Sequence, residues 1–256
     1  MKFVDLSVTI ENNLLSDPEE MIPQITYIDH EQSVENMLQF FGSAKKEDLP
    51  DGLAWAVEKI QLTTHTGTHL DAPYHYHPTM DNGKRSLTID EIPLDWCYGN
   101  GVLLDFSEKT DGYKLQIPDF EEALSKINYK IKENDIVLIR TGADKYWGTM
   151  KYLISGCGVS REATLWLINH GVKIVGTDAW SWDRPLSYIA EEFDRTGDSS
   201  IIWEGHFAGI EKCYCHIEKL TNLDKLPSHG FKISCYPIKI KKASAGWVRV
   251  VAMIED

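Results

Sequence analysis

The sequence predicts an α/β domain built on a mixed sheet with flanking helices. Two helix-then-strand units lead to this prediction: PDFEEALSKI precedes DIVLIRTG, and GVSREATLWLINHG precedes VKIVGTDAW. Units of this kind place helices over a sheet that contains parallel strands. Strand-like segments near both ends of the chain add further strands, so we expect the sheet to be mixed.

The first part of the chain is expected to hold two strands separated by an irregular segment. FVDLSVTI alternates apolar and polar residues from Phe3, which is typical of a strand. Residues 15–50 contain proline, acidic and amide residues with one short helical stretch, SVENMLQFF, and are expected to form an elaborated loop or cap. WAVEKIQLTT, from Trp55, is rich in β-branched residues near its end and predicts a strand.

The remaining elements follow from helix boundary signals and apolar runs. GVLLDFS predicts a strand, and Pro118 suits the first turn of the helix that follows it. Ser160 is expected to cap the next helix, and Gly171 to end it. Residues 181–205 are expected to be irregular, with FKISCYPIKI and GWVRVVAMI as closing strands. Since no repeat or linker is visible, we expect a single domain over residues 1–256.

The net charge and the cysteine content indicate which partners are unlikely and in which cellular compartment the protein is expected. The chain has 26 basic and 39 acidic residues, a net charge of −13, so nucleic acid and anionic membrane surfaces are not expected as partners. Its five cysteines form no CxxC motif, the first residues lack the blocks of a secretory signal, and no apolar run approaches about 20 residues. We therefore expect a cytoplasmic protein that acts on a small-molecule substrate.

The segment THTGTHLDAPYHYHP concentrates histidine and carboxylate side chains. His65, His69, Asp71 and His75 all occupy odd positions, so an extended strand would point them to one face. Such a strand would also spread them farther than one ion can gather, and the threonines, glycine and proline of the segment disfavour a helix. The chain is therefore expected to bend, with Gly67 as the pivot.

These side chains can serve as metal ligands, as parts of an acid/base device or as a polar loop. Two imidazoles and a carboxylate around a divalent ion leave coordination positions open, which is typical of catalytic sites. Such an ion activates water and polarises a carbonyl, and His75 has a side chain suited to general acid/base catalysis near neutrality. His77 falls outside the tight pattern and is expected not to bind the ion.

The stretch HTGTHLDAPYH, from His65 to His75, resembles the H-x-G-T-H-x-D-x-P-x-H signature of the metal-dependent cyclase-like hydrolase family. That family includes bacterial arylformamidase, isatin hydrolase and trans-dienelactone hydrolase. VLLDFS, DIVLIRTG, GVSREATLWL, VKIVGTDAWS and PIKIKKASAGWVRVVA resemble family blocks in family order, so the similarity covers most of the chain. The resemblance implies a swivelling β/β/α fold, one or two Zn²⁺ or Mn²⁺ ions, and a homodimer or homotetramer in which N-terminal segments complete a neighbour's site.

The resemblance also implies roles for particular residues. In the motif it implies three metal ligands, His65, His69 and Asp71, and one catalytic acid/base, His75. Members with two ions add a later histidine and glutamate, which match His206 in WEGHFAG and Glu218 in CHIEKLTNL. Glu204 and His216 are rival positions for these two.

The implied activity is hydrolysis of a cyclic amide, a lactone or an N-acyl arylamine. Insertions near residues 28–54 and 182–204, and the absence of tryptophan from LLSDPEEMIP, resemble the isatin hydrolase and dienelactone hydrolase branches more than arylformamidase. A lyase or cyclase that uses the same site, and a catalytically silent metal- or ligand-binding member, are the alternatives. The sequence leaves open whether four aromatic residues line a pocket or pack in the core: Tyr74, Tyr76, Trp180 and Trp182.

Overall fold

The computed structural model describes residues 1–255, in which helices and strands are mixed along the chain. The strands are β1 (Lys2–Asp5), β2 (Gln24–Ile28), β3 (Val57–Gln61), β4 (His69–Asp71), β5 (Thr79–Met80), β6 (Lys84–Arg85), β7 (Tyr98–Asp105), β8 (Lys114–Leu115), β9 (Ile136–Arg140), β10 (Gly158–Val159), β11 (Ile174–Thr177), β12 (Cys215–Glu218), β13 (His229–Ser234), β14 (Ala245–Trp247) and β15 (Val251–Ile254). The α-helices are α1 (Val34–Leu38), α2 (Pro73–Tyr76), α3 (Ile117–Lys126), α4 (Arg161–Asn169), α5 (Leu186–Thr196) and α6 (Glu204–Glu211).

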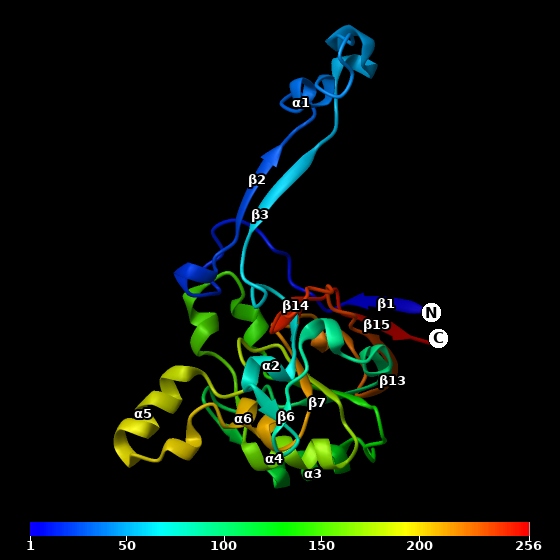
Figure 1. Cartoon of the computed structure of the whole chain (residues 1–256). Coiled ribbons are helices and arrows are strands. Elements are labelled where there is room, and N and C mark those ends of the chain that lie inside the picture. The colour runs from blue at the N-terminus through cyan, green and yellow to red at the C-terminus, as the bar shows by residue number, and fades with distance from the viewer. Residues whose placement is uncertain (256) are drawn as a thin grey trace.

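One mixed sheet joins most of these strands (Figure 1). Within residues 1–255, nine strands pair in the order β1-β15-β13-β7-β9-β11-β12-β4-β14. β7, β9, β11 and β12 are parallel to one another, whereas the strands on either side of them pair antiparallel. The predicted α/β class, a mixed sheet with flanking helices, is confirmed.

Successive side chains of the central strands point to opposite faces of the sheet, and both faces are buried. On β7, Leu103 lies in one apolar cluster, whereas Val102 and Leu104 lie in the other. Phe120 of α3 and Leu167 of α4 belong to the cluster of Val102, so these two helices cover that face. Parallel strands are typically buried on both faces, as here.

The helix signals read from the sequence are present at α3 and α4. Ser160 accepts a hydrogen bond at its Oγ from the Ala163 backbone N–H, at 3.2 Å, and so caps the start of α4. Gly171 follows the end of α4 with a φ of +92°, a left-handed conformation that glycine adopts readily. Pro118 lies in the first turn of α3.

Four segments differ from the sequence-based expectation, and the first is Gln24–Ile28, which forms β2 within the segment expected to be a loop or cap. The strand that begins near Phe3 ends at Asp5, and the C-terminal segment forms two strands, β14 and β15, in place of one. Residues 181–205, predicted to be irregular, contain α5, which has 11 residues. Gly197, with a φ of +67°, ends that helix, so a boundary signal for it was present in the sequence.

A two-stranded ribbon projects away from the sheet (Figure 1). β2 pairs with β3 alone, and α1 lies near the far end of the ribbon, within residues 28–54. Both strands expose large apolar side chains, since Tyr27 is 60% exposed and Ile60 is 57% exposed. An isolated two-stranded ribbon of this kind is marginally stable in water.

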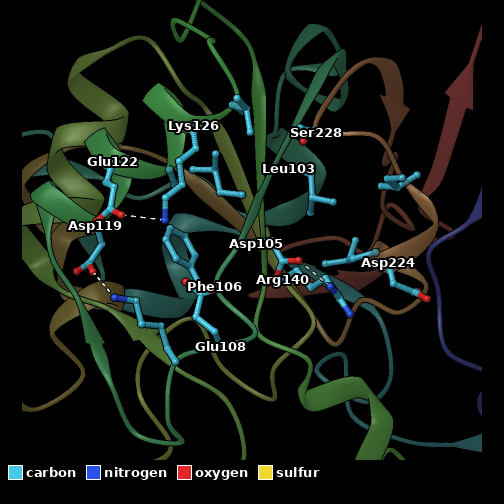
Figure 2. Close-up of a pocket in the computed structure, with 16 residues that line it drawn as sticks. Leu103, Asp105, Phe106, Glu108, Asp119, Glu122, Lys126, Arg140, Asp224 and Ser228 are labelled. Carbon is cyan, nitrogen blue, oxygen red and sulfur yellow. Dashed lines mark hydrogen bonds and ion pairs between the residues drawn. The ribbon is translucent and has the colours of Figure 1, made fainter.

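A polar pocket of about 270 Å³ lies beside the carboxyl ends of β7 and β9 (Figure 2). The sequence left open whether Arg140 pairs with a carboxylate or orients a substrate. Arg140 lies in this pocket, 2.7 Å from Asp105, and is not near the histidine-rich segment. The two lysines in the pocket wall are paired as well, Lys109 with Asp119 and Lys126 with Glu122. The pocket therefore offers no unpaired cation to a substrate acid.

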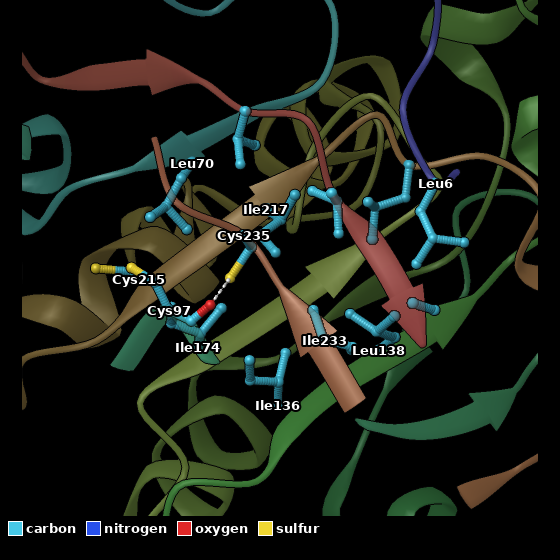
Figure 3. Packing of buried hydrophobic residues seen from close by; sticks show 14 of the residues in the cluster. Leu6, Leu70, Cys97, Ile136, Leu138, Ile174, Cys215, Ile217, Ile233 and Cys235 are labelled. Carbon is cyan, nitrogen blue, oxygen red and sulfur yellow. Dashed lines mark hydrogen bonds between the residues drawn. The ribbon is translucent and has the colours of Figure 1, made fainter. Parts of the chain in front are cut away.

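The face of the sheet opposite α3 and α4 packs on a second apolar cluster (Figure 3). Leu70 of β4 and Ile217 of β12 point into it, together with the buried thiols of Cys97, Cys215 and Cys235. All five cysteines are free. This packing fixes which side chains of β4 and β12 face the other way.

Candidate metal centre

Ligand-type side chains from two neighbouring strands meet on one face of the sheet. Because Leu70 and Ile217 point into the core, the residues on either side of them project from the opposite face. These residues are His69 and Asp71 on β4, and His216 and Glu218 on β12. The antiparallel register sets His216 opposite Asp71, and Glu218 opposite His69, which brings the four side chains together.

Three further histidines reach this cluster from a turn and two helices. His65 lies in the turn before β4, His75 on the single-turn helix α2, and His206 on α6. Gly67 makes the turn possible because its φ is +66°, and a Cβ atom there would lie 3.0 Å from the Ile10 side chain. The bend expected at Gly67 is therefore present.

One group of donor atoms surrounds Asp71 Oδ1. His65 Nδ1 lies 2.9 Å from this oxygen and His69 Nε2 lies 3.2 Å from it, while Glu218 Oε2 is 3.5 Å from His69 Nε2. Donors that share one ion at about 2.1 Å are expected to lie about 3.0–3.4 Å apart. The spacing therefore fits a shared divalent ion.

Two of these atoms are buried without any hydrogen-bond partner. They are His69 Nε2 and Asp71 Oδ1, both on side chains with no exposed surface. A buried polar atom left unpaired costs about 1–3 kcal/mol, so such atoms normally have a role. A metal ion that accepts both lone pairs fits them, which is the strongest indication that this cluster holds a metal.

A second group of donor atoms lies around the other oxygen of Asp71. Asp71 Oδ2 is 2.9 Å from His216 Nε2, which in turn is 3.2 Å from Glu218 Oε1. His206 Nε2 is 3.6 Å from the same glutamate oxygen. Each of these four side chains, Asp71, His206, His216 and Glu218, offers one donor atom, and the four atoms all lie within 4.8 Å of one another.

Hydrogen bonds from the surrounding chain orient the imidazoles. His69 Nδ1 contacts the Gly67 carbonyl oxygen at 2.8 Å, which turns Nε2 toward the cluster. His206 Nδ1 contacts Asp183 Oδ2 at 2.5 Å, and Asp183 also accepts hydrogen bonds from the backbone N–H groups of Gly205 and His206. A carboxylate or carbonyl behind each imidazole is characteristic of metal-binding histidines.

Charge in the cluster favours anionic carboxylates. Burial alone would raise the pKa of Asp71, but the imidazoles of His75, His69 and His65 hold it well below its usual range. Burial would also raise the pKa of Glu218, yet the hydrogen bond from His216 and the neighbouring imidazoles lower it to about 2. Both carboxylates are therefore ionised at neutral pH and available as ligands.

An apolar pocket of about 470 Å³ opens beside the donor cluster. Its polar end is formed by His65, His75, His206, Glu218 and Lys219, and its apolar wall by Met21, Trp180, Leu186, Ile189, Ile202, Trp203 and Phe207. Trp203 stacks on the His206 ring, with ring centroids 4.0 Å apart and an interplanar angle of 17°. The pocket thus combines a flat apolar wall with a polar end.

The sequence did not decide whether four aromatic residues line a pocket or pack in the core, and the structure places them in different environments. Trp180 lines the pocket, and its Nε1 donates to Asp17 at 2.8 Å. Trp182 has no exposed surface and belongs to the core cluster of α3 and α4. Tyr76 is buried and stacks on His216, whereas Tyr74 is 47% exposed and lies outside the pocket wall.

The structure brings together all six residues proposed from the sequence as ligands or catalytic groups: His65, His69, Asp71, His75, His206 and Glu218. Of the two rivals, Glu204 points away from the cluster and lies 3.0 Å from Lys114, but His216 lies inside it. His77 contacts Thr79 and is not part of the cluster. Sequence reasoning missed Asp183, although it lies in the DAWSWD segment that follows β11.

Comparison with known proteins gives the family. The model of the Cyclase family matches residues 4–184, so the chain belongs to this family. A kynurenine formamidase of Erythrobacter litoralis is 25% identical over 214 residues, which is 82% of this chain and 83% of that protein. An isatin hydrolase of Roseibium aggregatum is 24% identical, over 80% of this chain and 77% of that protein.

Solved structures share the fold over the whole chain. Isatin hydrolase A from Labrenzia aggregata, bound to benzyl benzoate, superimposes with a TM-score of 0.72 and 26% identity, and covers 100% of this chain and 94% of that one. An isatin hydrolase bound to the product analogue thioisatinate has a TM-score of 0.77 at 18% identity, with coverage of 100% and 93%. The predicted family and the predicted hydrolase class are confirmed, and the donor cluster supports a metal cofactor.

Among the residues that the structure describes, no helix is both long and apolar enough to cross a membrane.

Proposed function

We propose that this hydrolase uses a metal ion to cleave a cyclic amide, a lactone or an N-acyl arylamine. The observation that carries the proposal is the pair of buried, unpaired donor atoms, His69 Nε2 and Asp71 Oδ1, next to a pocket with an apolar wall. A metal site that opens onto a pocket of this kind suits a substrate with one polar carbonyl group and a flat apolar body.

A divalent ion held by His65, His69 and Asp71 would polarise the substrate carbonyl and activate a water molecule for attack. His75 lies at the pocket edge of this site, where its Nε2 is 3.8 Å from Asp71 Oδ2. Burial, which outweighs the attraction of Asp71, lowers the pKa of His75 to about 4, so its imidazole is neutral at pH 7 and can accept a proton.

Proton transfer through His75 completes the reaction. As the oxygen of water bonds to the carbonyl carbon, His75 takes the proton that the water loses. The bond from that carbon to nitrogen or oxygen then breaks, and His75 gives the proton to the leaving atom. The products are a carboxylic acid and an amine or alcohol, joined in one molecule where the substrate is cyclic.

The wall of the pocket supports a planar substrate. Trp180 and Trp203 present indole rings, and Phe207 adds a third aromatic side chain. Trp203 adopts a left-handed conformation, with φ of +54°, at the residue before α6, which sets its ring against His206. Because imidazole and carboxylate ligands suit both ions, we propose Zn²⁺ or Mn²⁺, with one or two ions per chain.

Proton release tests the proposal, since each hydrolysis generates an acid. Isatin, trans-dienelactone and N-formylkynurenine are incubated with the metal-replete chain, with the same chain after chelation, and with H75A. Turnover of one substrate that is lost on chelation and in H75A, but kept in the control H77A, supports the hydrolase. No turnover of any substrate with metal bound would contradict it.

Labelled water separates hydrolysis from a lyase or cyclase reaction. Hydrolysis places solvent oxygen in the carboxylate product, whereas a lyase that only stabilises an enolate does not consume water. Product made in ¹⁸O-water is analysed by mass spectrometry. Unlabelled product from a turning-over enzyme would replace the hydrolase proposal with the lyase one.

We also propose that the chain forms a homodimer or a homotetramer in the cytoplasm. The ribbon of β2 and β3 exposes the apolar side chains of Tyr27 and Ile60, which supports contact with a second copy of the chain. The five free cysteines support a reducing compartment. Sedimentation analysis should find a dimer or tetramer that the double variant Y27K/I60K weakens. A monomeric wild type would contradict the proposal.

A further inference from the structure

Lys219 is a buried lysine at the polar end of the apolar pocket. It follows Glu218 at the end of β12 and lines the pocket, although its side chain is only 1% exposed. Its ammonium group donates one hydrogen bond to the His65 carbonyl oxygen, at 2.8 Å, and another to Asp17 Oδ1. The positive charge of Lys219 is therefore compensated inside the protein by the carboxylate of Asp17.

Two features of Lys219 are unfavourable for the stability of the fold. Its backbone lies in the left-handed region, with a φ of +60°, which residues other than glycine adopt at a cost in free energy. A buried ion pair often stabilises a fold no better than apolar side chains of similar volume do. Because residues held in such conformations cluster at functional sites, we expect a role for Lys219 beyond stability.

The ammonium group of Lys219 has one N–H that no protein group uses. A lysine ammonium carries three donors and accepts no hydrogen bond. Within residues 1–255, two oxygens contact it, one from Asp17 and one from His65. The Trp180 indole lies beside it, with Nζ 5.4 Å from the ring centroid, and lines the same pocket. One donor is thus left for a molecule that enters the pocket.

The charges around this donor determine which oxygen suits it. Asp17 already compensates Lys219, so an anionic oxygen bound here would be a buried charge without a partner. A carbonyl oxygen is neutral and accepts a hydrogen bond without that cost. His65 and Lys219 lie at the same end of the pocket, so a carbonyl bound to Lys219 is expected to be close to the carbonyl that is cleaved.

We propose that Lys219 binds a second, neutral carbonyl oxygen of the substrate, next to the carbonyl that is hydrolysed. Asp17 and the His65 carbonyl oxygen hold the ammonium group in place for this contact. The enzyme then favours amides or lactones that carry two adjacent carbonyl groups over those that carry one. The inference rests on the hydrolase function proposed above, and it adds a residue that determines specificity.

The binding of two product-like acids tests this inference without turnover. Phenylglyoxylate has a ketone next to its carboxylate, whereas phenylacetate has a methylene group there, and both offer a carboxylate to the metal. In titration calorimetry the metal-replete wild type should bind phenylglyoxylate at least about tenfold more tightly, the factor that a hydrogen bond to a charged donor supplies. The double variant D17N/K219M removes the donor and the charge of Asp17 together, and it should bind the two acids almost equally.

K126M is the matched control, because Lys126 pairs with Glu122 on the protein surface and lies outside this pocket. It should keep the preference of the wild type. Circular dichroism and metal content show whether the double variant folds and binds metal. If it does not, the metal-free wild type decides, since the preference for phenylglyoxylate should remain there although both acids bind more weakly.

Three results would overturn the inference: equal binding of the two acids to the wild type, an unchanged preference in the folded double variant, or a preference that disappears when the metal is removed. The last result would mean that the ketone contacts the ion instead of Lys219. A chain that shows the expected preference but hydrolyses no substrate would contradict the proposed function and leave the role of Lys219 in binding standing.

Discussion

Glu218 lies directly opposite His69 across the antiparallel pair of β12 and β4, and Glu218 Oε2 is 3.5 Å from His69 Nε2. No hydrogen bond reaches that nitrogen, although it is completely buried. The folded chain thus holds an imidazole with its lone pair directed at anionic oxygens, an arrangement that a cation between them would stabilise.

Replacing His69 by alanine should therefore abolish metal uptake and turnover together. The substitution removes one of the three proposed ligands, which are His65, His69 and Asp71, so the ion would be left with an incomplete set. Metal content after dialysis and the initial rate of proton release are the two measurements. H170A is the control, because His170 is an exposed histidine at the end of α4. Full metal occupancy in H69A would remove His69 from the ligand set.

The sequence predicted the donors that lie close together in the chain better than those that lie far apart. His65 to His75 span a short segment, and Gly67 marked the bend that gathers them. Whether His216 or Glu204 faces the same cluster depends on which way side chains leave β12 and α6. On β12 the buried Ile217 places His216 and Glu218 on the opposite face, but the pairing of this strand with β4 depends on the tertiary structure.

The fold was predictable where boundary signals and burial coincide. β7, β9 and β11 are apolar runs next to capped helices, and all were found at the expected positions. The pairing of β2 with β3 was not predicted, because residues 29–56 separate the two strands and no short turn links them. Pairing across such a distance depends on the tertiary structure.

Asp183→Asn should weaken the binding of metal at His206. Asp183 Oδ2 lies 2.5 Å from His206 Nδ1 and holds the ring with its Nε2 toward Glu218. Loss of a carboxylate behind a metal-binding histidine typically costs about 10–100-fold in affinity. Competition with a chelator measures the change. D198N is the control, since Asp198 is an exposed carboxylate that caps a turn beyond α5. Equal metal affinity in D183N and D198N would show that the contact with His206 is not needed.

The metal-free protein should lose stability as the pH rises from about 7 to about 9. Burial alone would lower the pKa of His216, but hydrogen bonds to Asp71 and Glu218 raise it to about 9 from an ordinary value of 6.5. A group whose pKa is raised by folding stabilises the protein fully below its unfolded pKa, and this contribution is lost as the pH passes through the folded pKa. Burial raises the pKa of Asp178 to about 7, so the change in stability that its titration causes occurs below the range of pH 7 to 9.

Urea midpoints at several pH values, with chelator present, measure this dependence. H216Q lacks the titrating imidazole and should show a flatter dependence between about pH 7 and 9, while H77A should follow the wild type. The same slope in H216Q and in the wild type would show that His216 is not the responsible group.

Lys219→Met should destabilise the fold by about 3–5 kcal/mol, because it leaves a buried carboxylate without its charged partner. Lys219 and Asp17 are both almost fully buried, and the Lys219 ammonium group donates hydrogen bonds to Asp17 and, at 2.8 Å, to the His65 carbonyl oxygen. The free energy of unfolding in urea measures the loss. The double variant D17N/K219M should recover part of it, since the uncompensated charge is then absent. K126M is the matched control, because Lys126 pairs with Glu122 on the exposed surface of α3 and such pairs contribute little. A loss in K219M as small as that in K126M would show that the buried pair does not stabilise the fold.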